Sequence, residues 1–377
     1  MARNTGVMLL LIGLMGTLTG CPGLIDLVPD AAIVAQPASG RVPLTVHFEG
    51  KGFVSHENTS GDRIVAYEWD LGNGRTATGK RVTHTYSTPG TYTVKLTVTD
   101  DDGQTDSTRR QVDVAPARPE RIYWTNSGGG EILSSALDGS DVRTLFDGLS
   151  AAVPAGLSVD AEHHKVYWAN NGSDEIQRAD LDGTDQEAFL SGVTNPVGVE
   201  VDEANDKVYW TTQGRPSAVR RADLDGSNVE TVATLSGSGA EVEVAPSRGH
   251  VYWVDFEANA IQRANLDGSD VTDLITGIDD QPRGLALDLV NDRLYYTVAL
   301  GSDSGVKRAD LDGDGVEVLV NSTGEPTGID LDLANGKVYW TEWAANKFRR
   351  ADLDGSDPED LVTAGLNQPA LMELGPR

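Results

Sequence analysis

Few residues in this sequence of 377 have the type and spacing that catalysis or metal binding requires. The six histidines are scattered, with only His163 and His164 adjacent, and Cys21 is the one cysteine. The sequence has no His-Glu-x-x-His segment, nucleophile elbow or phosphate-binding loop. One cysteine also excludes an intrachain disulfide framework and a zinc site built from cysteines. We therefore predict no catalytic residues and no cofactor.

One acidic segment imitates the start of a calcium-binding loop. Residues 310–315 read Asp-Leu-Asp-Gly-Asp-Gly, which places carboxylates at alternate positions. The twelfth position of such a loop would be Asn321, where a bidentate glutamate is needed. The segment also coincides with a turn that recurs along the chain. We interpret it as that turn and predict no metal ligands.

The N-terminal residues indicate the compartment. Arg3 precedes an apolar run of 12 residues from Val7 to Leu18, which is followed by Thr19-Gly20-Cys21. A charged start, a short apolar run and small residues are the parts of a secretory signal. A helix that spans a bilayer needs about 20 apolar residues. We expect residues 1–20 to be removed and residues 21–27 to form a tether.

Residues 18–21 also resemble the lipobox of bacterial lipoproteins. The resemblance implies that Cys21 is lipidated, so that acyl chains anchor the mature chain to a membrane. The alternative is an ordinary secretory cleavage that leaves a free thiol. Pro22 stands where some inner-membrane lipoproteins carry Asp. We therefore expect an anchor in the cell envelope, at the outer membrane or the cell surface.

The charge restricts the partners. The chain has 58 Asp and Glu residues against 30 Lys and Arg, which gives a formal net charge of −28. Such a surface repels nucleic acid and anionic lipid, because phosphate binding depends on clustered cations. We predict no nucleic-acid partner and interpret the acidity as a means of keeping an exported protein soluble.

Residues 28–115 are predicted to form a β-sandwich. Apolar and polar residues alternate along residues 91–99, and shorter alternating segments occur at residues 44–48 and 65–69. Turn signals such as Gly72-Asn73-Gly74 lie between them. Short strands at a spacing of about ten residues favour two packed antiparallel sheets.

The same region resembles a PKD (polycystic kidney disease) domain. The resemblance implies an immunoglobulin-like sandwich that serves as a spacer or as a weak protein or glycan binder. We expect Trp69 in the core and a structural role for His84. At residues 100–102, where some relatives hold calcium, we expect a solvated acidic turn. The matching segments are Tyr67–Gly74, with Leu71 and Asn73 as departures, His84-Thr85-Tyr86 and Pro89–Tyr92.

Two series of residues repeat in phase between residues 116 and 377. Aromatic pairs recur every 42 to 44 residues, and a Leu-Asp-Gly turn follows each of them. Asp-Gly between alternating segments is a hairpin signal, and a period near 43 is typical of four-stranded propeller blades. The pairs are Tyr123-Trp124, Tyr167-Trp168, Tyr209-Trp210, Tyr252-Trp253, Tyr295-Tyr296 and Tyr339-Trp340.

A third series predicts how the ring closes. Segments such as Pro196-Val197-Gly198-Val199 precede the second to sixth pairs, with a degenerate copy at residues 239–244. The first pair has no such segment, whereas a spare one lies at residues 367–371. We predict six blades, with the C-terminal strand completing the first blade and removing an open sheet edge.

These repeats resemble the YWTD repeats of low-density-lipoprotein-receptor propellers. The resemblance implies a six-bladed β-propeller over residues 116–377, and so an all-β chain. This chain lacks the cysteine-rich modules of those receptors, and we do not transfer their ligands to it. The Asp of the motif is kept at Asp255 and replaced at Asn126, Asn170, Thr212, Val298 and Glu342.

Repeated and irregular positions are predicted to differ in role. Arg178 and its counterparts share a strand face with the Asp or Asn two residues later, which indicates structural charge or hydrogen-bond pairs. The loops after the Tyr-Trp strands vary, and function on repeat folds lies in such loops. By the resemblance these loops line one mouth of the ring, where Phe256 and Trp343 are candidate aromatic anchors for a ligand.

We expect a membrane-anchored extracytoplasmic binding or adhesion protein that recognises a protein or glycan through the propeller face. Two alternatives stay open. One is a scaffold that assembles envelope complexes. The other is a lyase or hydrolase whose scattered catalytic residues lie in the propeller channel. A channel without a polar cluster would count against the enzyme.

Overall fold

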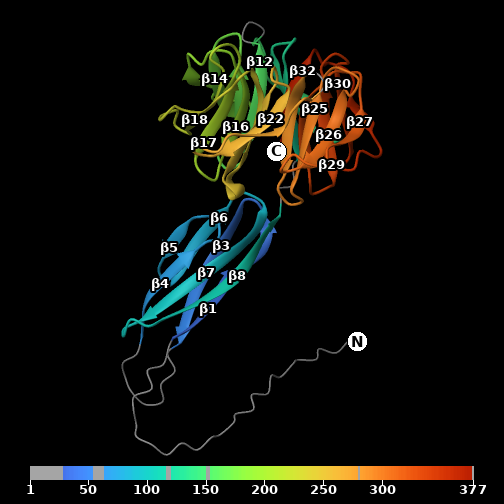
Figure 1. Ribbon diagram of the computed structural model, residues 1–377. Coiled ribbons are helices and arrows are strands. Elements are labelled where there is room, and N and C mark those ends of the chain that lie inside the picture. Colours follow the sequence, from blue (N-terminus) through green and yellow to red (C-terminus); the bar gives the residue numbers. More distant parts are fainter. Residues whose placement is uncertain (1–28, 54–62, 116–119, 150–152, 279–280, 376–377) are drawn as a thin grey trace, which may run out of the picture.

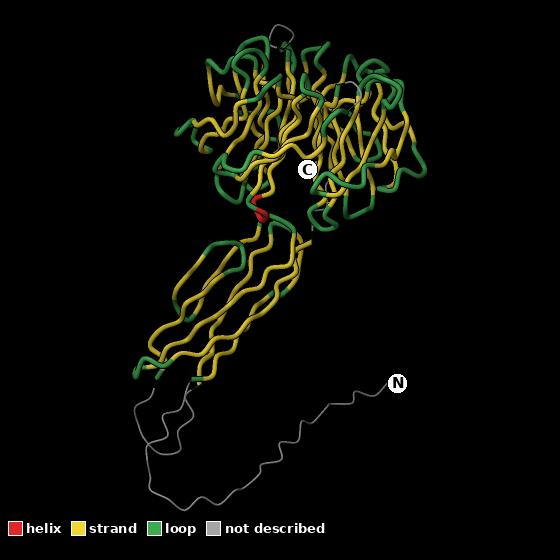
Figure 2. Tube along the Cα trace, in the orientation of Figure 1, coloured by secondary structure: helices red, strands yellow, loops and turns green. Residues whose placement is uncertain are grey.

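The computed structural model describes residues 29–53, 63–115, 120–149, 153–278 and 281–375. Cys21 and the predicted signal lie outside these residues. An elongated sandwich and a larger propeller follow each other along the chain (Figure 1). Strands make up nearly all the regular structure, and Figure 2 shows one short helical turn, η1 (Pro246–Arg248). The described part of the chain contains no helix long and apolar enough to cross a membrane.

The sandwich consists of two sheets. One has the strand order β1-β3-β6 and the other β2-β8-β7-β4-β5. All pairs are antiparallel except the short parallel pair of β2 with β8. The strands are β1 (Asp30–Gln36), β2 (Ser39–Arg41), β3 (Leu44–Phe53), β4 (Ile64–Asp70), β5 (Thr76–Thr78), β6 (Arg81–Tyr86), β7 (Gly90–Asp100) and β8 (Thr105–Ala115).

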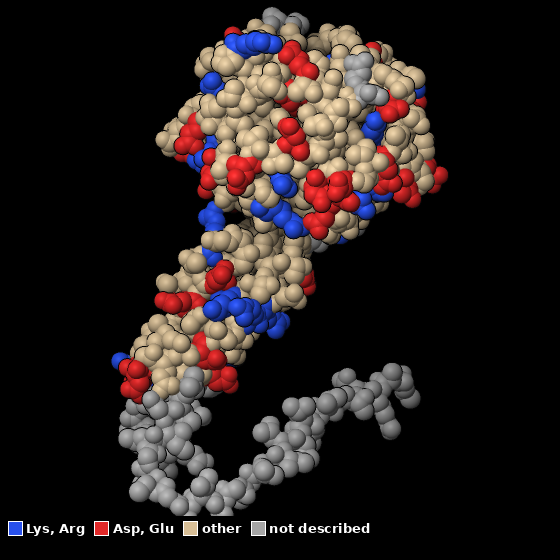
Figure 3. Space-filling view, in the orientation of Figure 1, with Lys and Arg blue, Asp and Glu red and all other residues tan. Residues whose placement is uncertain are grey.

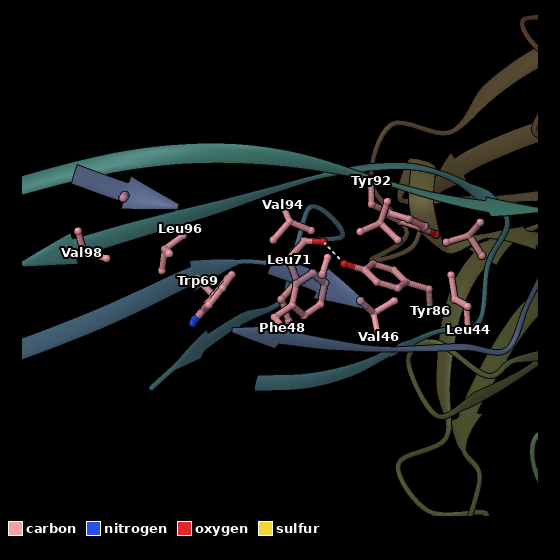
Figure 4. Close-up of a cluster of buried hydrophobic side chains, with 14 residues drawn as sticks. Leu44, Val46, Phe48, Trp69, Leu71, Tyr86, Tyr92, Val94, Leu96 and Val98 are labelled. Atoms are coloured by element: carbon pink, nitrogen blue, oxygen red, sulfur yellow. Dashed lines mark hydrogen bonds between the residues drawn. The ribbon is translucent and has the colours of Figure 1, made fainter. Parts of the chain in front are cut away.

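The sandwich core is built from the alternating residues that the sequence indicated (Figure 4). Trp69 is buried as predicted, and its Nε1 donates to the carbonyl oxygen of Gly79 at 2.8 Å. The Tyr86 hydroxyl donates to the Leu71 carbonyl oxygen at 2.9 Å, the bond drawn in Figure 4. Each buried polar tip thus finds a backbone acceptor, which is why these large side chains can pack inside.

The structure also shows the surroundings of His84 and of the acidic turn at residues 100–102. His84 shares a hydrogen bond with Asn73, with a distance of 3.0 Å between Nε2 and Nδ2. Asp100 accepts hydrogen bonds from the backbone N–H groups of Asp102 and Gln104. His84 has a local structural contact, as predicted. The acidic turn was predicted to be solvated, and this holds for Asp101 and Asp102 but not for Asp100, which is buried because it accepts these backbone N–H groups.

The rest of the chain forms six four-stranded antiparallel sheets around a central channel, as predicted. The first blade takes its inner strand from the C-terminus and has the order β32-β9-β10-β11. Its strands are β32 (Pro369–Gly375), β9 (Arg121–Asn126), β10 (Glu131–Ala136) and β11 (Arg143–Phe146).

The other five blades each consist of four consecutive strands, ordered from the channel outwards. Blades two and three are β12 (Pro154–Asp160), β13 (Lys165–Asn170), β14 (Glu175–Asp180), β15 (Glu187–Ser191), and β16 (Pro196–Asp202), β17 (Lys207–Thr212), β18 (Ala218–Asp223), β19 (Glu230–Thr234). Blade four is β20 (Gly239–Ala245), β21 (His250–Asp255), β22 (Ala260–Asn265) and β23 (Thr272–Ile275). Blades five and six are β24 (Pro282–Asp288), β25 (Arg293–Val298), β26 (Gly305–Asp310), β27 (Glu317–Asn321), and β28 (Pro326–Asp332), β29 (Lys337–Glu342), β30 (Lys347–Asp352), β31 (Glu359–Val362).

The closing strand pairs as the displaced sequence segment predicted. β32 is antiparallel to β9, with Met372 opposite Trp124 and Glu373 opposite Tyr123. Leu371 and Met372 are buried there. The pairing satisfies the backbone N–H and C=O groups along the edge of β9. Without β32 these groups would face the channel unpaired.

Glycine at the third position of an inner strand lets neighbouring blades approach closely. A Cβ atom added at Gly198 would lie 2.3 Å from the carbonyl oxygen of Ala240 on the next blade. Gly156, Gly284 and Gly328 meet the backbone of the following blade in the same way. The repeated Pro-x-Gly segments are therefore a packing requirement of the ring.

The repeated arginines are structural, but their partners differ from those predicted. Arg178 pairs with Glu187 on the outer strand at 2.8 Å and donates to the carbonyl oxygen of Leu224 in the next blade at 2.9 Å. Asp180, the predicted partner, pairs with Lys165 instead. The twist and register of the sheet bring cross-strand residues closer together than residues two apart on one strand. The arginine therefore pairs with the carboxylate on the neighbouring strand.

A second link between blades comes from the Thr of the YWTD motif. Thr341 accepts the N–H of Gly328 at 2.7 Å and donates to the carbonyl oxygen of Ala370 in the next blade at 2.6 Å. Thr211 and Thr297 make the same two bonds in their blades. One hydroxyl thus joins the inner strands of two blades.

Replacing Thr341 by Val should lower the free energy of unfolding by about 1–3 kcal/mol, because it leaves two buried backbone groups unpaired. Chemical denaturation followed by tryptophan fluorescence measures the change. Thr341→Ser keeps the hydroxyl and is the matched control. Unchanged stability in Thr341→Val together with a loss in Thr341→Ser would show that the methyl group matters and the bridge does not.

Candidate binding site at the propeller mouth

The two ends of the propeller channel have different surroundings. Each inner strand begins at one face of the ring and ends at the other. Arg75 of the sandwich donates to the carbonyl oxygen of Ala204, just after β16 ends, so the sandwich contacts the face where inner strands end. The face where inner strands begin is the opposite one, directed away from the sandwich (Figure 1). We call its opening the mouth.

The mouth contains a hollow of about 360 Å³. Its floor is formed by the second residue of each inner strand, and its rim by the first loop residue after the Tyr-Trp strands. The floor residues are Ala155, Val197, Ala240, Arg283, Thr327 and Ala370. The rim residues in the lining are Ser127, Asn171, Gln213, Ala299 and Trp343.

Hydrogen bonds between blades hold this rim. The residue before each of three inner strands has a left-handed backbone, with φ of 45° at Asn195, 62° at Gln281 and 57° at Gln368. Its N–H donates to an Asp or Asn side chain from the loop of the preceding blade. The pairs are Asn195 with Asp174 at 2.8 Å, Gln281 with Asn259 at 3.1 Å and Gln368 with Asn346 at 2.7 Å. These hydrogen bonds preorganise the mouth.

The two predicted anchors occupy the same position in different blades but have different surroundings. Trp343 lines the hollow and is 36% exposed. Its backbone N–H donates to the Glu325 carbonyl oxygen at 2.9 Å. Phe256 is half-buried against the core between blades four and five. The guanidinium of Arg283 lies 4.9 Å from the centre of its ring. Only Trp343 of this pair contributes to the lining.

Arg283 is a site residue that sequence reasoning missed. It extends from the floor of the hollow, stacks on Phe256 and donates to Gln281 Oε1 at 2.8 Å. Burial lowers the pKa of Arg283, although the negative charge of Glu325 opposes this shift. The sequence could have indicated it, because Arg283 is the one charged residue at the second position of the inner strands. The other blades carry small or neutral residues there.

Below the hollow, carboxylates line the channel. They occupy the fifth position of the inner strands, three residues beyond the floor and so roughly 10 Å deeper. Glu241, only 7% exposed, adds a further carboxylate at a third position where most blades have glycine. The fifth-position residues are Ser158, Glu200, Glu243, Ala286, Asp330 and Glu373. We call the five acidic residues among these positions the channel carboxylates: Glu200, Glu241, Glu243, Asp330 and Glu373.

Part of this layer satisfies the backbone of the ring. A fifth-position side chain accepts the free N–H of the sixth residue on the next inner strand. The bonds are Val159 to Glu373 at 2.7 Å, Leu374 to Asp330 at 2.7 Å and Val201 to Ser158 at 3.1 Å. Polar side chains thus accept the backbone N–H groups of the innermost strands, which a neighbouring strand would pair with in an open sheet.

The channel carboxylates are poorly solvated. Burial raises the pKa of Glu200 to about 8 and that of Asp330 to about 6. Burial first, and then repulsion from neighbouring carboxylates, holds the pKa values of Glu241, Glu243 and Glu373 well above their usual range. Burial therefore favours the protonated form of this group, and Glu200 is largely protonated at neutral pH.

The acidic segments noted in the sequence make local contacts. Asp310 pairs with Arg293 at 2.6 Å, and Asp312 accepts the N–H of Asp314, as expected for the recurring turn. Among the residues that the structure describes, no group of three potential ligands is placed to hold a metal ion.

Comparison with protein families agrees with the two-part fold. Residues 29–115 match the PKD domain model, and residues 120–161 and 249–289 match the low-density lipoprotein receptor repeat class B model. The chain contains a PKD domain followed by YWTD repeats.

Two curated relatives match the PKD region of the chain. The chain is 44% identical over 72 residues to the pre-pro-metalloprotease PrtV of Vibrio cholerae, and 31% identical over 91 residues to the collagenase ColA of Clostridium perfringens. These matches cover 18% and 24% of this chain and 8% of each relative. The chain thus shares a small part of the length of either protein.

Solved structures resemble the propeller. A structure of the nidogen/laminin complex superposes with a TM-score of 0.61 at 19% identity, covering 67% of this chain and 97% of that chain. A gluconolactonase from Xanthomonas campestris gives a TM-score of 0.51 at 19% identity, covering 67% and 89%. At these identities the likeness establishes the fold alone.

Proposed function

We propose that this chain is a membrane-anchored extracytoplasmic recognition protein that binds a protein or glycan at the propeller mouth. The carrying observation is the hollow with the exposed indole of Trp343 at its rim. An exposed aromatic side chain in a preformed concave site is the usual form of a binding anchor. The resemblance of the propeller to that of nidogen, solved in complex with laminin, is in keeping with a protein-binding ring.

The arrangement of the domains supports the same proposal. A lipid on Cys21 would attach the chain at its N-terminal end, ahead of the PKD domain. The PKD domain contacts the propeller on the face opposite the mouth. The mouth would then be directed away from the membrane, where a partner can reach it.

Two measurements test the anchor and its orientation. Globomycin-sensitive labelling with a fatty acid analogue should be lost in Cys21→Ser, since only a lipidated cysteine retains the label. Protease added to intact cells should degrade the propeller if the protein is displayed on the surface. Full protection of the propeller would contradict surface display and favour the envelope scaffold.

Truncating the rim indole should weaken binding. We expect Trp343→Ala to reduce capture of the partner in a pull-down by at least tenfold, which corresponds to about 1.4 kcal/mol. Phe256→Ala removes the ring beneath Arg283 and should have a smaller effect through the displaced guanidinium. Trp343→Phe is the matched control. Capture unchanged in Trp343→Ala would refute the mouth as the binding site.

A second candidate function, a hydrolase or lyase, is supported by one observation. The channel carboxylates are a polar cluster in the channel, and protonated carboxyl groups near neutral pH are the form a general acid takes. However, none of the five lines the hollow at the mouth. Turnover of a lactone or polysaccharide substrate that disappears in Glu200→Gln would favour the enzyme over the binding protein.

A further inference from the structure

The lining of the mouth narrows the class of ligand that the proposed function requires. The hollow of about 360 Å³ lies at the lower end of the range of about 300–1,000 Å³ that small-molecule sites occupy. It therefore admits a ring-sized group and excludes a folded segment of chain. Whatever enters must complement one indole, one guanidinium, the carboxylate of Glu325 and several uncharged polar groups.

Arg283 is the one cationic side chain among the residues that line the hollow. Among the described residues, its guanidinium makes no ion pair, and its one side-chain hydrogen bond goes to the neutral Gln281. Stacking on Phe256 orients the plane of the guanidinium and leaves other N–H donors for a ligand. A planar fork of donors matches a carboxylate in a bidentate manner.

The electrostatic field does not oppose an anion at this point. Residues 120–375 carry 46 acidic and 18 basic side chains, and Figure 3 shows acidic groups distributed over one face of the propeller. At physiological salt, charges on the outer wall are screened over about 8 Å. The channel carboxylates lie roughly 10 Å deeper, and burial favours their protonated form, with a pKa of about 8 for Glu200. Of the two charged side chains in the lining, Arg283 and Glu325, only Arg283 can bind an anion.

The other polar groups of the lining indicate what carries that carboxylate. Side-chain amides come from Asn171, Gln213 and Gln368, and Trp343 presents its indole at the rim. Amides can both donate to and accept from hydroxyl groups. An indole face packs against the C–H groups of a pyranose ring, whereas a short acidic side chain of a peptide would leave both the indole and the amides without a partner.

We propose that the mouth binds a uronic acid residue of an acidic polysaccharide, with its carboxylate on Arg283 and its ring on Trp343. The inference rests on the proposed function and names its ligand class. The amides of the rim would hydrogen-bond the ring hydroxyls, and Glu325 would accept from one of them. The hollow is open at the rim, so neighbouring sugar residues of the chain can continue outside it.

The test uses the full mature chain in detergent and a panel of short uronate oligosaccharides: oligogalacturonate, oligomannuronate, oligoguluronate and hyaluronan fragments. Titration is followed by tryptophan fluorescence and calorimetry. We expect at least one uronate to bind, and its carboxyl-reduced form to bind at least tenfold more weakly. Arg283→Gln should match that loss for the uronate, with Arg283→Lys in between, and Trp343→Ala should lose at least tenfold for both forms.

Several outcomes would overturn the inference. Equal binding of a uronate and its reduced form excludes the carboxylate contact, and binding unaffected by Arg283→Gln and Trp343→Ala excludes the site. An acidic peptide that binds while every uronate fails assigns the mouth to a protein ligand. If no uronate binds but Trp343→Ala still abolishes capture of the partner, the ligand class is wrong and the proposed function stands.

Discussion

Deleting residues 367–377 should abolish the cooperative unfolding transition of the propeller and leave that of the PKD domain in place. The deletion removes β32, the inner strand of the first blade, together with the buried side chains of Leu371 and Met372. Each buried aliphatic side chain lost from a core costs about 2–5 kcal/mol, and whole domains are stable by only about 5–15 kcal/mol. The backbone edge of β9 would also face the channel unpaired.

Calorimetry on the mature chain would detect this change as the loss of one of two transitions. The PKD transition should persist, because its core consists only of residues between Ala31 and Val114. A chain that ends at Gly375 keeps the whole of β32 and is the matched control. A propeller transition that survives the longer deletion would mean that the ring does not depend on its closing strand.

Neutralising a channel carboxylate should stabilise the propeller at alkaline pH. The folded-state pKa of Glu200 is about 8, against an ordinary value of 4.5, and those of Glu243 and Glu373 are also raised. Between these values the folded chain binds more protons than the unfolded chain, so stability falls as pH rises. The stabilising effect is fully present below about pH 4.5 and is lost as pH rises through about 8.

Glu200→Gln imitates the protonated form permanently. We expect it to raise the free energy of unfolding at pH 8 by about 1–3 kcal/mol, since one unit of pKa shift corresponds to about 1.4 kcal/mol. At pH 4.5 the difference from the parent chain should nearly vanish. Denaturation curves at both pH values test this, with the exposed Glu257→Gln as control. A variant that is stabilised equally at both pH values would exclude titration as the cause.

Local patterns predicted most of this architecture for a physical reason. A strand with one buried face alternates, and a hairpin with a left-handed turn favours Gly, Asn or Asp, so both features can be recognised from neighbouring residues. The Tyr-Trp and Leu-Asp-Gly series recur because every blade solves the same packing problem. The spare segment at residues 367–371 predicted ring closure, and β32 pairs with β9 as expected.

Contacts between strands and between blades were harder to predict from the sequence. Arg178 was expected to pair with Asp180 along its own strand, yet it bonds across strands to Glu187 and across blades to the backbone of Leu224. Spacing along one strand gives no information on which residue of another strand lies opposite. In the first blade, where Ser134 replaces the repeated arginine, Arg121 from the adjacent strand bonds to Ser134 instead. The contact between Arg121 and Ser134 could be recognised only with the sheet register known.

The sequence by itself therefore determined the all-β class, the six blades, their closure and the position of two aromatic loop residues. It left Phe256 and Trp343 equivalent, because they occupy the same place in the repeat. The tertiary structure separated them, since Arg283 from the neighbouring blade covers Phe256 and leaves Trp343 at the rim. It also gathered Glu200, Asp330 and Glu373 into one layer of the channel. Those residues are far apart in the chain, and only closure of the ring brings their side chains into the same poorly solvated space.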